Sequence, residues 1–293
     1  MQKNIHFSEG EKGKPLVIFI NGMGMDSILW TSPSEARILG GKYLLKALLK
    51  GMNTDMRTSY ADLKERGFPM ITWDQKRPAG PISVAVSGLR EVVDYGRKYA
   101  GSGIFLVCHS RGGLIARKYL EHREPLVRGL VTLATPHRGT TMAKWAGLLS
   151  PAASFLSQML KKTGKEDITP AFQRVLRFLG GKGLKELLPK SRFYKNLKDK
   201  RQKGMRCLSV GGTNPDLVKF GEVSLAGVLD RIAPDMVIPE ELKDGLGDGM
   251  VSAASSVLPY ADTHHNFHVN HAAILFDKGA RDCIVEMGES LSL

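Results

Sequence analysis

Short apolar runs alternate with amphipathic stretches along most of the 293-residue chain. Apolar runs bounded by glycine or polar residues predict strands, and these cover residues 15–24, 68–74, 103–108, 127–139 and 205–213, three of which continue into loops. Apolar residues at helical spacing predict helices over residues 34–50, 84–99 and 113–121. Strands that alternate with helices form βαβ units, so the pattern predicts an α/β fold in which helices flank a mostly parallel central sheet.

One basic segment interrupts this alternation. From Thr140 to Arg206 the chain has sixteen lysine and arginine residues but only four acids, which places +12 of the net charge of +13 there. Apolar residues still recur at helical spacing, and Pro151 and Pro170 each suit the first position of a new helix. The sequence therefore predicts a single domain over residues 1–293, with a basic helical lid inserted at about 140–205.

The basic segment admits two interpretations. Amphipathic helices with basic flanks bind lipid interfaces, which predicts peripheral contact between the lid and an anionic membrane surface. A charge run is more often only a solvated face. Nucleic acid is excluded as a partner, because the segment has few aromatic residues for base stacking and no recognised binding motif. The oligomeric state is left open.

The chain contains no apolar stretch of about 18 to 20 residues, the length that a membrane-spanning helix needs. Its N-terminus is polar and lacks a signal-like apolar run, which predicts a cytoplasmic protein, with a removed signal peptide as the alternative. The three cysteines, Cys108, Cys207 and Cys283, cannot form a disulfide framework and show no metal-ligand spacing.

The stretch FLVCHSRGGLIARKYL, residues 105–120, has the form of a nucleophile elbow. An apolar strand leads to Ser110, two glycines follow, and a helical pattern continues the chain. This order places a serine hydroxyl on a sharp turn at the carboxyl end of the sheet. Cys108 stands where the G-x-S-x-G pattern has its first glycine. It is small enough for the turn, and we interpret it as a buried packing thiol rather than a second nucleophile.

A nucleophilic serine needs a base and a carboxylate that orients the base. On a sheet of this kind the partners follow in the order serine, acid, histidine. Asp248 lies between two glycines after the last predicted strand, and His271 directly precedes the apolar run 272–276, so this pair meets the order. Asp244 is the nearest rival acid, whereas Asp74 comes too early in the chain.

An oxyanion hole needs two backbone N–H groups directed at the developing negative charge. Arg111, directly after the serine, is one predicted donor. Met23, in the glycine-rich loop after the first predicted strand, is the other. The glycines of that loop would let its backbone turn toward the serine.

The remaining histidines have simpler interpretations. His264, His265 and His268 suggest a metal site, but no cysteine or carboxylate completes the ligand set, so we interpret them as surface residues. No metal and no cofactor is predicted. His137, in the TPHRG stretch, is expected to be a structural hydrogen-bonding residue near the site.

Five short blocks together resemble the lipases of the α/β-hydrolase superfamily. They are INGMG (20–24), CHSRGG (108–113), TLATPHRGT (132–140), GDGMV (247–251) and NHAAI (270–274), in the order of that family. The resemblance implies an α/β-hydrolase fold and a serine carboxylic-ester hydrolase, a lipase or esterase that cleaves acyl esters through an acyl-enzyme on Ser110. Asn21, where the family has a histidine, and Cys108 depart from the pattern.

Other functions stay open. The protein could be a deacylase or an acyltransferase that acts on a lipid-linked or phospholipid substrate, because an alcohol can replace water in the attack on an acyl-enzyme. It could also be a non-catalytic lipid-binding protein on the same fold. The presence of all three triad residues favours an enzyme, but the sequence does not indicate the acyl chain length or the head group.

Overall fold

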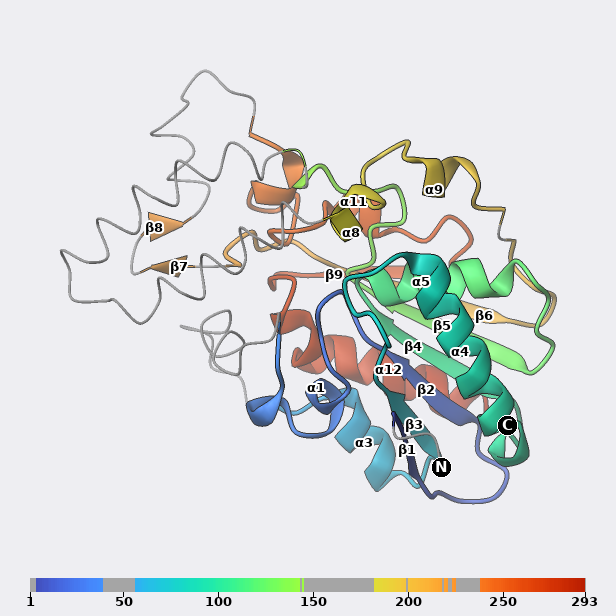
Figure 1. Ribbon diagram of the computed structural model, residues 1–293. Coiled ribbons are helices and arrows are strands. Elements are labelled where there is room, and N and C mark those ends of the chain that lie inside the picture. The colour runs from blue at the N-terminus through green and yellow to red at the C-terminus, as the bar shows by residue number, and fades with distance from the viewer. Residues whose placement is uncertain are drawn as a thin grey trace.

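The computed structural model describes residues 4–38, 56–142, 144, 182–198, 200–217, 219–220, 223–224 and 238–292 (Figure 1). Most of the predicted lid at about 140–205 therefore lies outside the described residues. Its last part is described and contains two short helices, α8 (Lys182–Lys185) and α9 (Arg192–Lys195). Leu184 and Leu187 are buried in this part, so it packs against the rest of the protein.

A seven-stranded sheet forms the centre of the molecule, in the order β1-β3-β2-β4-β5-β6-β9. Each pair of neighbours is parallel except β1 and β3. All residues of β2 and β4 are buried, as expected for parallel strands that helices cover on both faces. The strands are β1 (Ile5–Ser8), β2 (Leu16–Ile20), β3 (Met70–Trp73), β4 (Ile104–His109), β5 (Val127–Leu133), β6 (Arg206–Gly212) and β9 (Thr263–Phe267).

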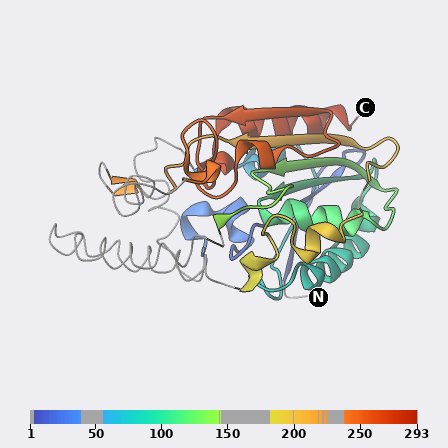
Figure 2. The same ribbon diagram turned by 90° about the horizontal axis from the view of Figure 1, so that it is seen from above.

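Helices cover both faces of this sheet. Helices α4 (Ile82–Gly96) and α5 (Arg111–Leu120) lie together on one face, and Figure 2 shows α12 (Lys278–Ser290) on the opposite face. Helix α3 (Ser59–Glu65) contacts α12. The two are joined by an ion pair of 2.9 Å between Arg281 Nη1 and Asp62 Oδ2. The predicted α/β architecture is confirmed.

Shorter elements occupy the loops. They are α1 (Ile28–Thr31), α11 (Ala253–Ser256), a small antiparallel pair β7 (Lys219–Phe220) and β8 (Val223–Ser224), and the 3-10 turns η1 (Pro33–Glu35), η2 (Arg97–Tyr99), η4 (Glu240–Leu242) and η5 (Ala273–Leu275). None of the helices in the described ranges is both long and apolar enough to cross a membrane.

The predicted helix over residues 34–50 is wrong at its start. Only a 3-10 turn forms there, after which the backbone of Ala36 is extended. Asp26 exchanges hydrogen bonds with the Arg37 backbone, and Ile38 pairs with Met25 as an isolated bridge. This pairing with the loop after β2 holds residues 36–38 in an extended form, while residues 39–50 lie outside the described part of the chain.

Candidate active site

Ser110 occupies the turn between β4 and α5 in an unusual backbone conformation. Its φ and ψ angles are 53° and −126°, a region that residues with a side chain rarely adopt. Three hydrogen bonds hold its backbone there. The Ser110 N–H donates to the carbonyl of Leu133, and the Ser110 carbonyl accepts from Thr135 Oγ1 and from the Gly113 amide. Such local strain is typical of a nucleophile elbow, where it lifts the hydroxyl out of the sheet.

The two glycines after Ser110 allow the turn to pack closely. A Cβ atom at Gly112 would lie 2.3 Å from the carbonyl oxygen of Ile20, and one at Gly113 would lie 2.3 Å from Thr135 Oγ1. Cys108, at the position of the missing glycine, is fully buried within β4. Burial raises the pKa of its thiol well above the usual value, which keeps the sulfur protonated and unreactive.

The structure brings Ser110, His271 and Asp248 into one hydrogen-bonded chain. His271 Nε2 lies 2.9 Å from Ser110 Oγ, and His271 Nδ1 lies 2.8 Å from Asp248 Oδ2. A carboxylate accepts hydrogen bonds only, so Nδ1 donates its proton to Asp248, and Nε2 is then free to accept from the serine hydroxyl. All three residues are buried, with Asp248 only 1% exposed. The arrangement can deprotonate the serine as the hydroxyl attacks a carbonyl.

Backbone amides hold the Asp248 carboxylate. Its Oδ1 atom accepts hydrogen bonds from the amides of Met250 and Val251, at 2.9 and 2.7 Å. Gly249, between Asp248 and Met250, has a φ of 91°, which a residue with a side chain would adopt only under strain. The loop thus leaves Oδ2 as the oxygen directed at His271.

The backbone of His271 is held from both sides. Its N–H donates to the Asp248 carbonyl at 2.9 Å, and its carbonyl accepts a hydrogen bond of 2.9 Å from His109 Nε2. Burial, and next the nearby His271, lower the pKa of His109 to about 3, so His109 is neutral. This contact was not predicted from the sequence, although His109 is the residue directly before the nucleophile.

The rival acids lie elsewhere. Asp74 Oδ1 accepts a hydrogen bond from the Ser27 amide at 2.8 Å. Asp244 is exposed, and its Oδ1 atom lies 3.7 Å from His268 Nε2. Neither carboxylate is hydrogen-bonded to His271, whose Nδ1 contacts Asp248.

The other predicted histidines differ in their surroundings. His137 is buried, accepts a hydrogen bond from Arg117 and donates one to Thr132 Oγ1 at 3.0 Å. Its pKa is lowered well below the usual value, first by burial and then by the Arg117 charge. His264 and His265 lie in strand β9, at the sheet edge. Within the described ranges, no three histidine, cysteine or acidic residues are placed to hold a metal ion.

The two predicted oxyanion residues lie in segments next to the nucleophile. Met23 is buried in the loop after β2, and Arg111 is the first residue of α5. The loop approaches the serine closely, since a Cβ atom at Gly22 would lie 3.2 Å from Ser110 Cβ.

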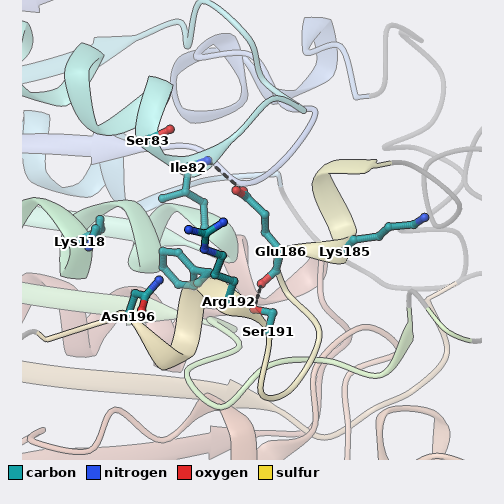
Figure 3. A pocket seen from close by; sticks show the side chains of 9 residues that line it. Ile82, Ser83, Lys118, Lys185, Glu186, Ser191, Arg192 and Asn196 are labelled. Carbon is teal, nitrogen blue, oxygen red and sulfur yellow. Dashed lines mark hydrogen bonds between the residues drawn. The ribbon is translucent and has the colours of Figure 1, made fainter.

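A separate cavity of about 420 Å³ lies beside helices α4 and α5 (Figure 3). It lies among the start of α4, the end of α5 and the α8–α9 segment, and its lining does not include the triad. Its lining residues are Ile82, Ser83, Lys118, Lys185, Glu186, Ser191, Arg192, Phe193 and Asn196.

Solved structures share this fold across nearly the whole chain. A lipase of Bacillus licheniformis, BlEst2 in mature form, is 17% identical with a TM-score of 0.53, and 97% of each chain is covered. A metagenomic carboxyl esterase, MGS0156, is 14% identical with a TM-score of 0.55 over 97% of this chain and 76% of that one. A putative non-heme bromoperoxidase of Mycobacterium tuberculosis, BpoC, is 14% identical with a TM-score of 0.52, over 99% and 97% of the two chains.

These similarities establish the α/β-hydrolase fold, as predicted, but at such low identity they carry no more than the fold. A comparison with curated proteins finds no match. A family match is more specific, because the palmitoyl protein thioesterase family matches residues 54–203, just over half of the chain, including the Ser110 elbow. The protein therefore has the α/β-hydrolase fold of lipases and esterases, and it belongs to the palmitoyl protein thioesterase family.

Proposed function

We propose that this protein is a serine acyl hydrolase that releases a long acyl chain from a carboxylic ester or thioester through an acyl-enzyme on Ser110. The observation that carries the proposal is the hydrogen-bonded chain Ser110–His271–Asp248, with distances of 2.9 and 2.8 Å. A retired, purely lipid-binding hydrolase fold would have no need to keep these three groups aligned or to hold Ser110 at a strained turn.

Each residue of the hydrogen-bonded chain Ser110–His271–Asp248 has its own part in this mechanism. His271 Nε2 takes the proton of Ser110 as its Oγ attacks the acyl carbonyl, and it then protonates the leaving group. Water, activated by the same nitrogen, releases the acid and restores the serine. Asp248 keeps His271 in the correct tautomer, and the Met23 and Arg111 amides are the proposed donors to the oxyanion.

Membership of the palmitoyl protein thioesterase family favours a long acyl chain on sulfur as the substrate. A thiolate is the easier leaving group, since a cysteine thiol has a pKa of about 8.5, far below that of an aliphatic alcohol. Oxyesters would then depend more strongly on proton donation by His271 than thioesters do.

The basic segment at about 140–205 is proposed as a lid that contacts an anionic membrane surface. In its described part the cations are exposed while Leu184 and Leu187 are buried, so the charge faces solvent. The exposed cations are Lys144, Lys185, Lys190, Arg192, Lys195, Lys198, Lys200, Arg201 and Lys203. Binding to vesicles that contain anionic lipid should weaken as salt is added, because surface electrostatics is screened.

The test uses matched acetyl and palmitoyl substrates, each as an oxyester and as a thioester. Hydrolysis should increase with chain length, and Ser110→Ala should abolish it for all four substrates. A serine-directed fluorophosphonate should label the wild-type protein and not the Ala variant. Activity that survives in folded Ser110→Ala would overturn the proposal, and a folded wild type without labelling would favour a binding protein.

A further inference from the structure

A buried cation lies directly beside the nucleophile. The side chain of Arg111, the residue after Ser110, is fully buried. Its guanidinium donates to the carbonyls of Gly80 and Pro78, at 2.6 and 3.0 Å, and to Gln75 Oε1. All three acceptors lie in the loop after β3. Arg111 therefore ties the start of α5 to a loop that is about 30 residues earlier in the chain.

Gln75 connects Arg111 to the predicted oxyanion loop, residues 21–24. Gln75 is buried, and its Nε2 group donates to the carbonyl of Asn21 at 2.9 Å. Asn21 directly precedes Gly22 and Met23, and its side chain is fixed as well. Its Oδ1 atom accepts from Trp30 Nε1 at 2.7 Å, and its Nδ2 group donates to the carbonyl of Trp73.

The other end of the oxyanion loop has the same support. The amide of Gly24 donates to the carbonyl of Pro78 at 3.1 Å, and this carbonyl also accepts from Arg111. Met23 is thus held between two anchored neighbours, Asn21 and Gly24. Asn21 and Gly24 are both connected to Arg111, through Gln75 and the Pro78 carbonyl, and the amide of Arg111 is the second predicted oxyanion donor.

The far side of the loop after β3 is held by α8. A Cβ atom at Gly183 would lie 2.3 Å from the carbonyl oxygen of Ala79 and 3.5 Å from Met23 Cε. Glu186 Oε2 accepts a hydrogen bond of 3.0 Å from the Ile82 amide, as Figure 3 shows. The loop is therefore enclosed between Arg111 on one side and the α8 segment on the other.

A guanidinium in this position is costly to the fold. Within the described part of the chain, Arg111 makes no bond to a carboxylate, and its Nε atom has no hydrogen-bond partner. Burial lowers the pKa of Arg111 to about 10. The nearby Glu186 charge acts in the opposite direction but does not offset the burial. A buried guanidinium that is not hydrogen-bonded to a carboxylate contributes little to stability, so its contacts with the loop suggest a further role.

We propose that Arg111 and Gln75 are positioning residues, which set the separation of the two backbone donors at the oxyanion site. This inference rests on the proposed function. Neither side chain touches the reacting atoms. They act by fixing the Met23 peptide relative to the Arg111 peptide, and such donors are effective only when they are held in place before the reaction.

The experiment measures kcat and KM for Arg111→Met, Arg111→Lys and Gln75→Met, with a palmitoyl oxyester as substrate. Arg281→Met is the matched control, because Arg281 is also a buried arginine with an unbonded Nε, but it pairs with Asp62 on the opposite face. We expect kcat to fall about 10- to 100-fold in Gln75→Met and Arg111→Met with little change in KM, since a small displacement of such donors costs about this much. Arg281→Met should lose stability but keep kcat.

A second readout uses an alkyl boronic acid, which forms a tetrahedral adduct on a nucleophilic serine. Its affinity should fall in parallel with kcat, while fluorophosphonate labelling should still go to completion. The double variant that combines Arg111→Met with Gln75→Met should be no slower than the slower of the two single variants, because both substitutions break the same hydrogen-bond network. Wild-type kcat and boronate affinity in a folded Gln75→Met would overturn the inference even if Ser110→Ala is inactive. Activity in Ser110→Ala would instead overturn the proposed function.

Discussion

The two sides of the nucleophile are built differently. On the oxyanion side, side chains from separate parts of the chain hold the loops, with Arg111 bonded to Gln75 and Gln75 to Asn21. On the acid side, Asp248 is fixed by amides only two and three residues away. A long-range network ties activity to residues far from the chemistry, whereas a local turn confines the sensitivity to the carboxylate itself.

The largest effect is expected when the negative charge of Asp248 is removed. Asp248→Asn should lower kcat for a palmitoyl oxyester by about 10³- to 10⁴-fold, because His271 would then adopt the wrong tautomer. The loss should be smaller for the matching thioester, whose leaving group needs less protonation. Steady-state kinetics on both substrates measures the difference, with Asp244→Asn as the control that keeps wild-type rates. Equal losses in the two aspartate variants would contradict the assignment of Asp248.

A smaller effect is expected at Glu241, where a substitution should lower the stability of the fold and leave kcat unchanged. Glu241 is buried, and its Oε1 atom accepts hydrogen bonds from the Thr141 amide and hydroxyl and from Thr140 Oγ1. Glu241→Gln weakens these charge-assisted bonds and should cost about 1.5 to 3 kcal/mol in the free energy of unfolding. Its kcat should stay near the wild-type value, unlike that of Gln75→Met. Urea unfolding and kinetics on the same samples test this contrast, and a large fall in kcat with unchanged stability would reverse it.

The last expected effect concerns pH, and it is gradual because it is spread over several pH units. His109 and His137 are neutral in the folded protein because burial lowers both pKa values, that of His109 to about 3. Below about pH 6.5 the unfolded chain binds protons that the folded protein does not, so stability falls as pH decreases from 6.5 toward 3. Each histidine contributes up to about 1.4 kcal/mol per pH unit to this slope.

Urea unfolding of the wild type and of His137→Gln between pH 7 and pH 5 measures the contribution of one histidine. The slope should be lower in the variant, by about one proton. An identical slope in both proteins would mean that His137 does not stay neutral in the fold.

The central strands and the nucleophile could be predicted from sequence because their signals are local. Strand β4 is apolar from Ile104 to Cys108, and Ser110 sits between this strand and two glycines. Strand β9 could not be predicted, because its residues THHNF are mostly polar and its formation depends on pairing with β6 at the sheet edge. The extended residues 36–38 depend on contacts with Asp26 and Met25, which helical spacing cannot reveal.

The candidate site likewise combines residues that could be predicted from sequence with contacts that could not. Chain order was sufficient to name Asp248 and His271, which the structure brings together with Ser110. The contacts of Gln75 and His109 were not predicted, because their partners are distant in the chain: Gln75 contacts the Asn21 carbonyl and the Arg111 side chain, and His109 contacts the His271 carbonyl. For Gln75, the one signal that the sequence offered was its position directly after the strand predicted over residues 68–74.

The left-handed backbone of Ser110 has a consequence for engineering. Glycine adopts such angles without the steric cost that serine bears, so relieving the strain at this turn would stabilise the fold by about 1 kcal/mol or more while removing the nucleophile. Selection for thermal stability alone would therefore favour the loss of this hydroxyl. A thermostable variant of this protein is best sought at sites away from the elbow, with activity screened at every round.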